Sequence, residues 1–317
     1  LDGKLFSKLD FELMYYLRKT SSMLMGVPYP YTTGYGSLVR NVGGLQNSGI
    51  DVRLGYDILR SRDYYVRAGI NFNYNNDKVT ELFQGRQRWE IANTLVAYVV
   101  GKPVMYYLPI WAGVNPADGS PQWYIPGSNI DETTMDPSRV TNQFDETTLT
   151  QNSGHRVNAP FNGGFNISAG WKGLTLSADF AVVLGKYLVN NDMYFYANFA
   201  AVQTSYNQHK MVNDFWRADN TNAKFPDWTK GWGMQFDSHL LENASFMRLK
   251  SLQIGYVLPK SLLAWQNVVE GLKFTFTGRN LFTITDYTGI DPEVDANVSL
   301  GRLGNTRQIL FGVEVTF

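Results

Sequence analysis

The residues best suited to acid–base chemistry lie in polar segments that separate apolar runs. His209 and His239 share one such segment with Asp214 and Asp237. An Asp–His pair can activate water for hydrolysis, so a hydrolase is one hypothesis for this chain. The third histidine, His155, lies in a different segment, and the three show no spacing typical of metal ligands. The simpler interpretation is that all three are solvated loop histidines.

Composition excludes several other chemistries. The chain has no cysteine, which rules out disulfides, thiol catalysis and cysteine-ligated metals. It has no glycine-rich phosphate loop and no G-x-S-x-G nucleophile elbow. Lys+Arg and Asp+Glu both total 28, so nothing suggests nucleic acid as a partner. A calcium site in the acidic segment 129–146 is conceivable, but a solvated loop explains it more simply. We therefore expect no catalytic residue, no metal site and no cofactor.

Aromatic residues concentrate in the long polar segment 189–244. They are Tyr194, Phe195, Tyr196, Phe199, Phe215, Trp216, Trp228 and Trp232. Aromatic faces stack on sugar rings and on peptide side chains, so this segment is the place to expect substrate or partner contact. The candidates for such contact are Tyr194, Tyr196, Trp216, Trp228 and Trp232. Alternatively, a loop of this length uses its aromatic residues to build a small core of its own.

The elements that position these segments are amphipathic strands. Apolar and polar residues alternate in runs of roughly 10 residues, the length that a tilted membrane strand needs. In 64–75, for example, Val66 and Ile70 alternate with Arg67 and Asn71. This pattern predicts about ten strands. They cover 9–17, 50–58, 64–75, 103–114, 120–125, 165–171, 174–184, 247–258, 271–283 and 307–317.

The connections between these strands alternate in length. Short ones fall at 59–63, 115–119, 172–173 and 259–270, and long polar ones at 19–45, 76–101, 126–160, 189–244 and 284–306. Short periplasmic turns and long outer loops are typical of a transmembrane antiparallel β-barrel. A soluble β-sandwich or propeller also has half-buried strands, but its loops have no reason to alternate in length.

The alternation also assigns the two faces of the strands. The residues expected to face lipid are Val66, Ile70, Phe72, Leu176, Phe180, Phe276, Phe311 and Val313. Those expected to face a wet lumen are Arg53, Arg67, Asn71, Asn73, Asp179, Lys273 and Glu314.

Several motifs resemble one known family. "SFMRLKSLQIGYVLPKSLL" (245–263), "FTFTGRNLFTITDYTGIDPEV" (274–294) and the closing "FGVEVTF" are similar to the C-terminal end of SusC-like TonB-dependent outer-membrane transporters of Bacteroidetes. Segments 15–54 and 101–124 match the same family in the same order. The resemblance covers most of the chain outside the loops.

The resemblance implies a 22-stranded barrel occluded by an N-terminal plug, with a SusD-like lipoprotein as an outer lid. Residues 1–317 would then be the C-terminal part of the barrel, about ten of its strands, with the plug and N-terminal strands absent. The implied function is active import of an oligosaccharide or oligopeptide across the bacterial outer membrane, powered by the TonB complex through the missing N-terminal part. The alternative is a ten-stranded outer-membrane hydrolase of omptin type.

Three parts of the matching motifs have more specific expectations. Gly278, Arg279 and Asn280 are expected to form a kink and a lumenal hydrogen-bond network at the top of a strand, with substrate contact as the less simple alternative. Asp291-Pro292-Glu293 is expected to fix a loop turn, because proline locks φ and aspartate caps turns. A last strand that closes on phenylalanine resembles the signal that the insertion machinery reads in outer-membrane barrels. Phe317 is therefore a candidate insertion signal.

Overall fold

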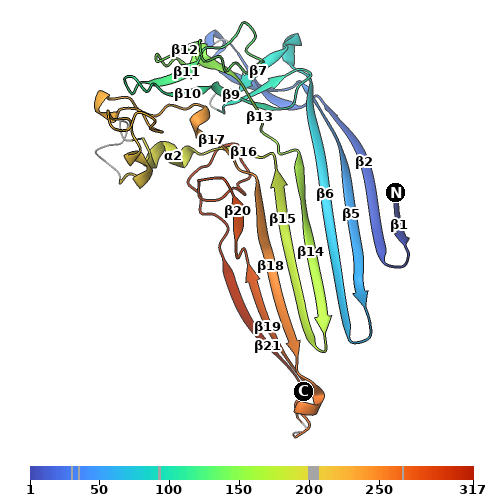
Figure 1. The fold of residues 1–317 in the computed structure, drawn as a ribbon. Coiled ribbons are helices and arrows are strands. Elements are labelled where there is room, and N and C mark those ends of the chain that lie inside the picture. The colour runs from blue at the N-terminus through green and yellow to red at the C-terminus, as the bar shows by residue number, and fades with distance from the viewer. Residues whose placement is uncertain (30, 35, 92–93, 199–206, 266–267) are drawn as a thin grey trace.

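One tall antiparallel sheet dominates the computed structural model, which describes residues 1–29, 31–34, 36–91, 94–198, 207–265 and 268–317 (Figure 1). We call this ten-stranded sheet the wall sheet. Its strands are β1 (Asp2–Leu5), β2 (Leu9–Ser21), β5 (Gly44–Arg60), β6 (Tyr64–Glu81), β14 (Phe161–Trp171), β15 (Leu174–Leu184), β18 (Phe246–Val257), β19 (Gly271–Arg279), β20 (Thr283–Thr285) and β21 (Gln308–Thr316).

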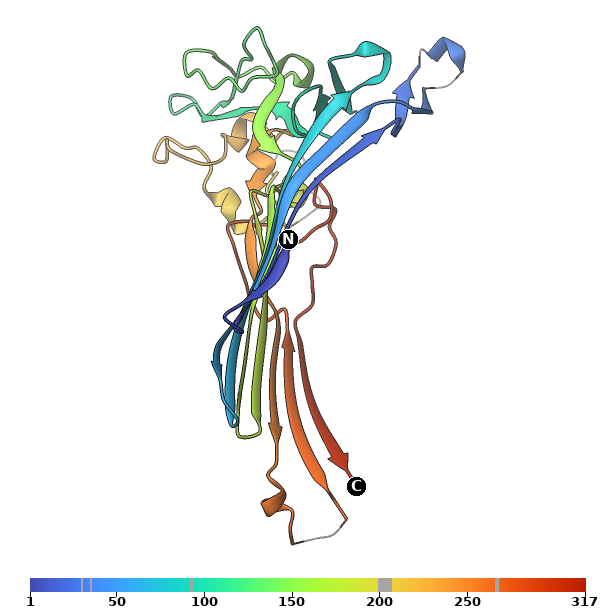
Figure 2. The same ribbon diagram turned by 90° about the vertical axis from the view of Figure 1, so that its right-hand side faces the viewer.

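The wall sheet is a meander. Its order is β1-β2-β5-β6-β14-β15-β18-β19-β21, and β20 pairs with β18 beyond the end of β19. Apart from β20, each strand therefore pairs with the next wall strand along the chain, always antiparallel. Viewed from the side, the sheet is a thin, curved layer (Figure 2). In the described residues its two edge strands, β1 and β21, do not pair with each other.

The hairpin between β14 and β15 shows how sequence sets the register. Lys172 and Gly173 both adopt positive φ, 45° and 87°, as a two-residue hairpin turn of matching twist requires. The strands then pair without interruption from Trp171–Leu174 to Phe161–Leu184. The hairpin predicted over 172–173 is confirmed.

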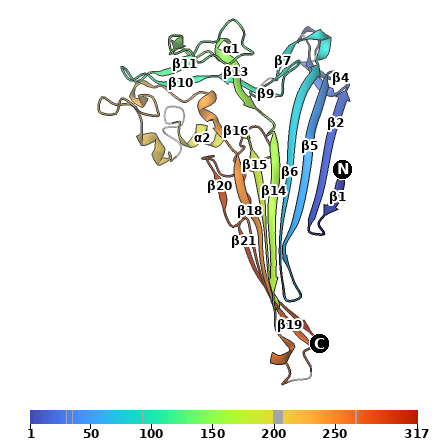
Figure 3. The same ribbon diagram turned by 45° about the vertical axis from the view of Figure 1, so that its right-hand side comes forward.

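The long connections gather at one end of the wall sheet, where they form what we call the outer layer (Figures 1 and 3). It contains four small antiparallel sheets. Their strands are β3 (Leu24–Pro28), β4 (Ser37–Asn41), β7 (Arg88–Ile91), β8 (Val96–Val99), β9 (Met105–Pro109), β10 (Trp111–Val114), β11 (Pro121–Tyr124), β12 (Val140–Thr141), β13 (Thr150–Arg156), β16 (Tyr187–Val189) and β17 (Leu241–Asn243).

Helical segments are short. Those of the outer layer are α1 (Glu146–Leu149), α2 (Asn191–Tyr196), η1 (Tyr31–Thr33), η2 (Phe83–Gly85), η3 (Lys210–Asn213), η4 (Trp228–Lys230) and η5 (Ser238–Leu240). The remaining one, η6 (Lys260–Leu262), lies in the turn at the opposite end of the wall sheet. Across the described residues, none of these helices is long and apolar enough to cross a membrane.

The hydrophobic core lies in the outer layer. Tyr106, Leu108, Val189 and Leu240 are fully buried there. The apolar side chains of the wall sheet are instead largely exposed, and Phe311 retains 80% of its accessible surface. A broad sheet with an uncovered apolar face is what a lipid-facing wall requires.

Two strands predicted for the membrane wall belong to the outer layer. Segment 103–114 forms β9 and β10, segment 120–125 forms β11, and none of the three pairs with the wall sheet. Every residue of β9 is buried, so its apolar run reflects the core rather than one lipid face. Strands β1 and β20 were not predicted separately. Both wrongly assigned segments lie in the one connection between β6 and β14. Removing them merges two long connections and a short one into a single long connection, so long and short connections still alternate along the wall sheet.

Candidate substrate-facing surfaces

One face of the wall sheet carries a continuous polar network, which we call the polar wall. Arg67 on β6 reaches the adjacent strand β5 and, beyond it, β2. Its Nη1 lies 2.7 Å from Oδ1 of Asp57 on β5, and its Nη2 lies 2.5 Å from Oδ2 of Asp10 on β2. Arg53 donates to Glu12 across β2 and β5 at 2.9 Å. Opposite charges are thus matched from strand to strand, so the network is locally neutral.

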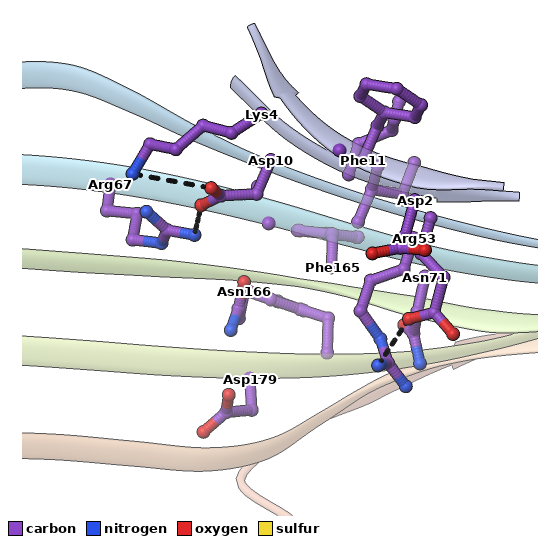
Figure 4. Close-up of a pocket in the computed structure, with 17 residues that line it drawn as sticks. Asp2, Lys4, Asp10, Phe11, Arg53, Arg67, Asn71, Phe165, Asn166 and Asp179 are labelled. Carbon is purple, nitrogen blue, oxygen red and sulfur yellow. Dashed lines mark hydrogen bonds and ion pairs between the residues drawn. The ribbon is translucent and has the colours of Figure 1, made fainter. Parts of the chain in front are cut away.

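A concave pocket of about 850 Å³ lies along this network (Figure 4). Glycine opens the space for it, because a Cβ on Gly55 would lie 2.5 Å from Nη2 of Arg67. Asn71 extends the polar lining along β6, and Asn166 and Asp179 continue it over two further strands, β14 and β15. In the described part of the chain, no hydrogen bond or ion pair engages the Asp179 carboxylate. The pocket therefore presents amides, charge pairs and the carboxylates of Asp2 and Asp179, and its lining also includes apolar side chains such as Phe165 and Phe180.

The register supports the face assignments made from sequence. Arg67, Asn71 and Asn73 lie opposite Asp57, Arg53 and Asp51 of β5, all on one face. Phe165 and Phe180 pair on the other face, with ring centroids 4.4 Å apart.

Three aromatic candidates pack within the outer layer. Trp228 is 7% exposed and belongs to the hydrophobic core. Tyr194 stacks on Phe236 with centroids 4.4 Å apart, and Tyr196 packs against the same core. Their contacts are those of a loop building its own interior. Phe199 lies outside the described residues.

Trp216 and Trp232 are placed differently. Both are half-buried, and the Lys230 ammonium lies between them, 5.3 Å from the Trp216 centroid and 5.1 Å from the Trp232 centroid. Trp216 Nε1 donates to the Pro116 carbonyl at 3.0 Å, which holds the loop against the β10–β11 turn. These two tryptophans are therefore the aromatic candidates nearest to a ligand-accessible position.

Arg279 and Asn280 end strand β19. The Arg279 side chain is exposed, and its backbone lies opposite Ser251 and Gln308. Asn280 has φ of 51°, and its Nδ2 donates to the Thr306 carbonyl at 3.1 Å. The positive φ of Asn280 ends the strand with a change of chain direction, and its side-chain hydrogen bond holds the following loop. Phe317 follows β21 and is 77% exposed; its role in insertion stays a prediction.

The Asp-Pro-Glu motif makes contacts that the sequence did not reveal. Asp291 accepts from Arg248 Nη2 at 2.5 Å and from the Asn305 backbone at 2.7 Å. Glu293 accepts from Arg248 at 2.6 Å and from Lys250 at 2.5 Å. The motif thus fastens the last long loop to β18, a stronger role than fixing a turn. Burial would raise the pKa of Asp291, but the hydrogen bonds from Arg248, Asn305 and Glu293 outweigh it and hold that pKa below its ordinary value.

The histidines do not form catalytic pairs in the described structure. Asp237 accepts from Trp123 Nε1 at 2.6 Å and from the His239 backbone at 2.8 Å, while the His239 ring stacks on Trp111. Burial raises the pKa of Asp237 to about 7 and lowers the pKa of His239 to about 4. His155 stacks on Tyr187 instead.

The acidic segment also has structural contacts. Asp131 accepts from Tyr107 at 2.9 Å and from Arg88 at 3.2 Å. Asp145 caps helix α1 by accepting from the Thr147 backbone. Over the described ranges, no cluster of three or more His, Cys, Asp or Glu side chains could hold a metal.

Comparison with known proteins gives no matching family model but several full-length similarities to this chain. TonB-dependent receptor P3 of Formosa agariphila is 25% identical over 347 residues, covering 100% of this chain and 33% of the receptor. TonB-dependent receptor SusC of Bacteroides thetaiotaomicron is 22% identical over 330 residues, covering 100% of this chain and 30% of SusC.

Solved structures agree with these relatives. A structure of the RagAB peptide transporter matches with a TM-score of 0.88 and 39% identity, covering 98% of this chain and 34% of the matched chain. The RagAB peptide importer in its 'open-open' state matches with a TM-score of 0.86 and the same identity, 39%. The chain spans about a third of the length of the relatives it matches.

An antiparallel wall with one apolar and one polar face, topped by long loops, defines the class of outer-membrane β-barrel proteins. Within that class, the chain is SusC-like and corresponds to part of a TonB-dependent receptor, as its sequence motifs indicated. Its location is the bacterial outer membrane. The relatives are receptors and transporters rather than enzymes, and they do not favour the omptin-type hydrolase.

Proposed function

We propose that this chain forms part of a TonB-dependent transporter that imports oligopeptides across the outer membrane. The observation that carries the proposal is the 39% identity over 98% of the chain to a structure described as a peptide transporter. The similarity to SusC is lower, 22%. The chain would supply barrel wall, lumen lining and outer loops.

The polar wall suits such a substrate. A peptide in extended form presents amide groups at regular intervals together with side chains of either charge. The pocket beside Arg67 offers matched charge pairs, the amides of Asn71 and Asn166, and the Asp179 carboxylate. Oligosaccharides also bind amide-rich surfaces, so an oligosaccharide is the second candidate substrate.

We further infer that residues 1–317 are the C-terminal part of a larger barrel. Unpaired strand edges are costly in lipid, so β1 and β21 require strands from outside this segment. The lid partner would be a SusD-like surface lipoprotein resting on the outer layer. Energy would come from the TonB complex through a plug-bearing segment that is also outside 1–317.

The test is uptake by cells that carry or lack the full-length transporter. Fluorescent oligopeptides and oligosaccharides of similar mass are supplied separately, with and without a protonophore. We expect the deletion strain to lose peptide uptake, complementation to restore it, and the protonophore to abolish it. Loss of oligosaccharide uptake alone would establish the second candidate, and energy-independent uptake would contradict a TonB-driven mechanism.

A further inference from the structure

The most complete small site outside the polar wall is an aromatic cage in the outer layer. It consists of Trp216, Trp232 and the Asp118 carbonyl, and Lys230 occupies it. The Lys230 ammonium donates to the Asp118 carbonyl at 2.5 Å while lying about 5 Å from both indole rings. The aromatic rings and the carbonyl together satisfy the two needs of an ammonium group, a π-face and a hydrogen-bond acceptor.

The Trp216 side of the cage has contacts that do not involve Lys230. Trp216 is held by its Nε1 bond to Pro116, and its ring lies against Gly119, where a Cβ would stand 2.6 Å away. The Asp227 backbone N–H donates to the Gly119 carbonyl at 3.0 Å, which ties the two loops together independently. Removing the lysine head group would therefore leave the Trp216 face of the site in place.

The hold on Lys230 is modest. Its side chain is 44% exposed, and its ion pair with Asp227 is long, at 3.7 Å. Oδ1 of Asp227 accepts from both Thr229 N and Thr229 Oγ1, so only Oδ2 forms the long ion pair with Lys230. A ligand that offers a similar cation could therefore exchange with Lys230.

We propose that Trp216 and Trp232 form a binding site for an ammonium group of the imported peptide, either a lysine side chain or the α-amino group, which displaces Lys230. The choice of a peptide as the source of the cation rests on the proposed function. Each aromatic contact at a partly exposed site is worth a severalfold change in affinity, so the pair supports about tenfold discrimination.

The first experiment uses the cation alone, n-butylammonium, and the full-length transporter. Lys230→Met empties the cage, whereas Lys230→Arg keeps it occupied. We expect Lys230→Met to bind n-butylammonium about tenfold more tightly than Lys230→Arg, and Trp216→Leu/Trp232→Leu added to Lys230→Met to abolish binding. Equal binding by the two lysine variants, or binding that survives loss of both tryptophans, would overturn the proposal.

Two controls keep the result interpretable. Trp265→Leu removes an exposed tryptophan in the connection between β18 and β19, outside the outer layer, and should change nothing. Protease resistance of the outer layer reports whether Lys230→Met loosens the loop. If Lys230→Met loosens the loop, Lys230→Gln is used in its place, because glutamine can still donate to the Asp118 carbonyl. We then expect a gain in n-butylammonium affinity between those of Lys230→Arg and Lys230→Met.

The second experiment separates this site from the transport function. Two oligopeptides of the same sequence are compared for binding and uptake, one with its lysine and α-amino groups free and one with both groups acetylated. We expect the wild type to prefer the peptide with free ammonium groups and the double tryptophan variant to lose that preference while still importing the acetylated peptide. Equal handling of both peptides by every variant contradicts the cage but leaves peptide import standing. Cage binding of n-butylammonium without import of either peptide contradicts the transport function alone.

Discussion

Nη2 of Arg248 lies 2.5 Å from Oδ1 of Asp291, and the two side chains are only 4% and 6% exposed. The residues are 43 positions apart in sequence, on β18 and in the last long loop. A buried charge pair of this kind is held by its mutual geometry, and removing one partner leaves the other charge in a poorly hydrated place.

Replacing Asp291 should therefore destabilise the barrel strongly. We expect Asp291→Ala to cost about 3 kcal/mol, the lower end of the range for breaking a buried charge pair, because Glu293 still pairs with Arg248. The matched control is Glu314→Ala, which breaks the exposed pair with Lys273 (3.4 Å) and should cost less than about 1 kcal/mol. Urea unfolding of the full-length protein in lipid measures both. Similar costs for the two variants would contradict the importance of the buried pair.

The same pair predicts acid sensitivity. The pKa of folded Asp291 is held below its ordinary value, so its contribution to stability is present above the unfolded pKa of about 3.9. That contribution is lost as pH falls through the lower folded pKa. Stability of the wild type should drop more steeply below about pH 4 than that of Asp291→Asn, which unfolding titrations at several pH values would show.

The burial of His239 leads to a second prediction, about how the stability of the outer layer depends on pH. Burial lowers its pKa to about 4, so the folded state favours the neutral ring, and the related stability is lost as pH falls from about 6.5 to about 4. His239→Phe should keep the stack on Trp111 without this titration. We expect the variant's outer layer to resist protease at pH 5 better than the wild type. His209→Phe, at an exposed position, serves as the control. An equal gain in protease resistance from that variant would contradict the assignment of the effect to burial of the His239 ring.

The two faces of β15 should differ in their tolerance of charge. Phe180→Arg would place a cation against lipid and should cost about 2–4 kcal/mol, whereas Asp179→Arg should cost much less. The two positions are adjacent and share one strand, so strand propensity cancels in the comparison. Refolding titrations in lipid measure the difference, and equal costs would reverse the assignment of faces.

Asn280 offers a test of whether its conformation or its side chain matters. At a φ of 51°, glycine is tolerated and a β-branched residue is not. Asn280→Gly should lose only the bond to Thr306, about 1 kcal/mol, while Asn280→Val should cost more. If uptake falls in Asn280→Gly at unchanged stability, Asn280 has a substrate-contact role in addition to its structural one.

Residues 1–317 expressed alone should not form a stable monomeric barrel. Edges β1 and β21 would leave backbone groups unsatisfied in lipid at a cost of several kcal/mol for each group. Heat-modifiable mobility on gels and protease resistance are the measurements. A resistant monomer would contradict the proposal that further strands complete the wall.

The sequence predicted the wall well because lipid and water impose a strict period of two on each membrane strand. The prediction failed at 103–114. There Tyr106 and Leu108 are fully buried and so are the residues between and beside them, so the segment has no exposed face. A continuous apolar run of that kind differs from true alternation, and the difference was available in the sequence. The Lys230 cage and the Arg248–Asp291 pair were not accessible, because both join segments whose proximity depends on the tertiary fold.

Strands β6 and β14 pair directly along the whole length of β14, although the largest outer-layer insertion lies between them in the chain. The hydrogen bonds of the wall therefore do not pass through that insertion. Selection can lengthen, shorten or replace it without altering the register of the membrane strands. The outer surface of the protein can in this way change while the pairing of the membrane strands stays the same.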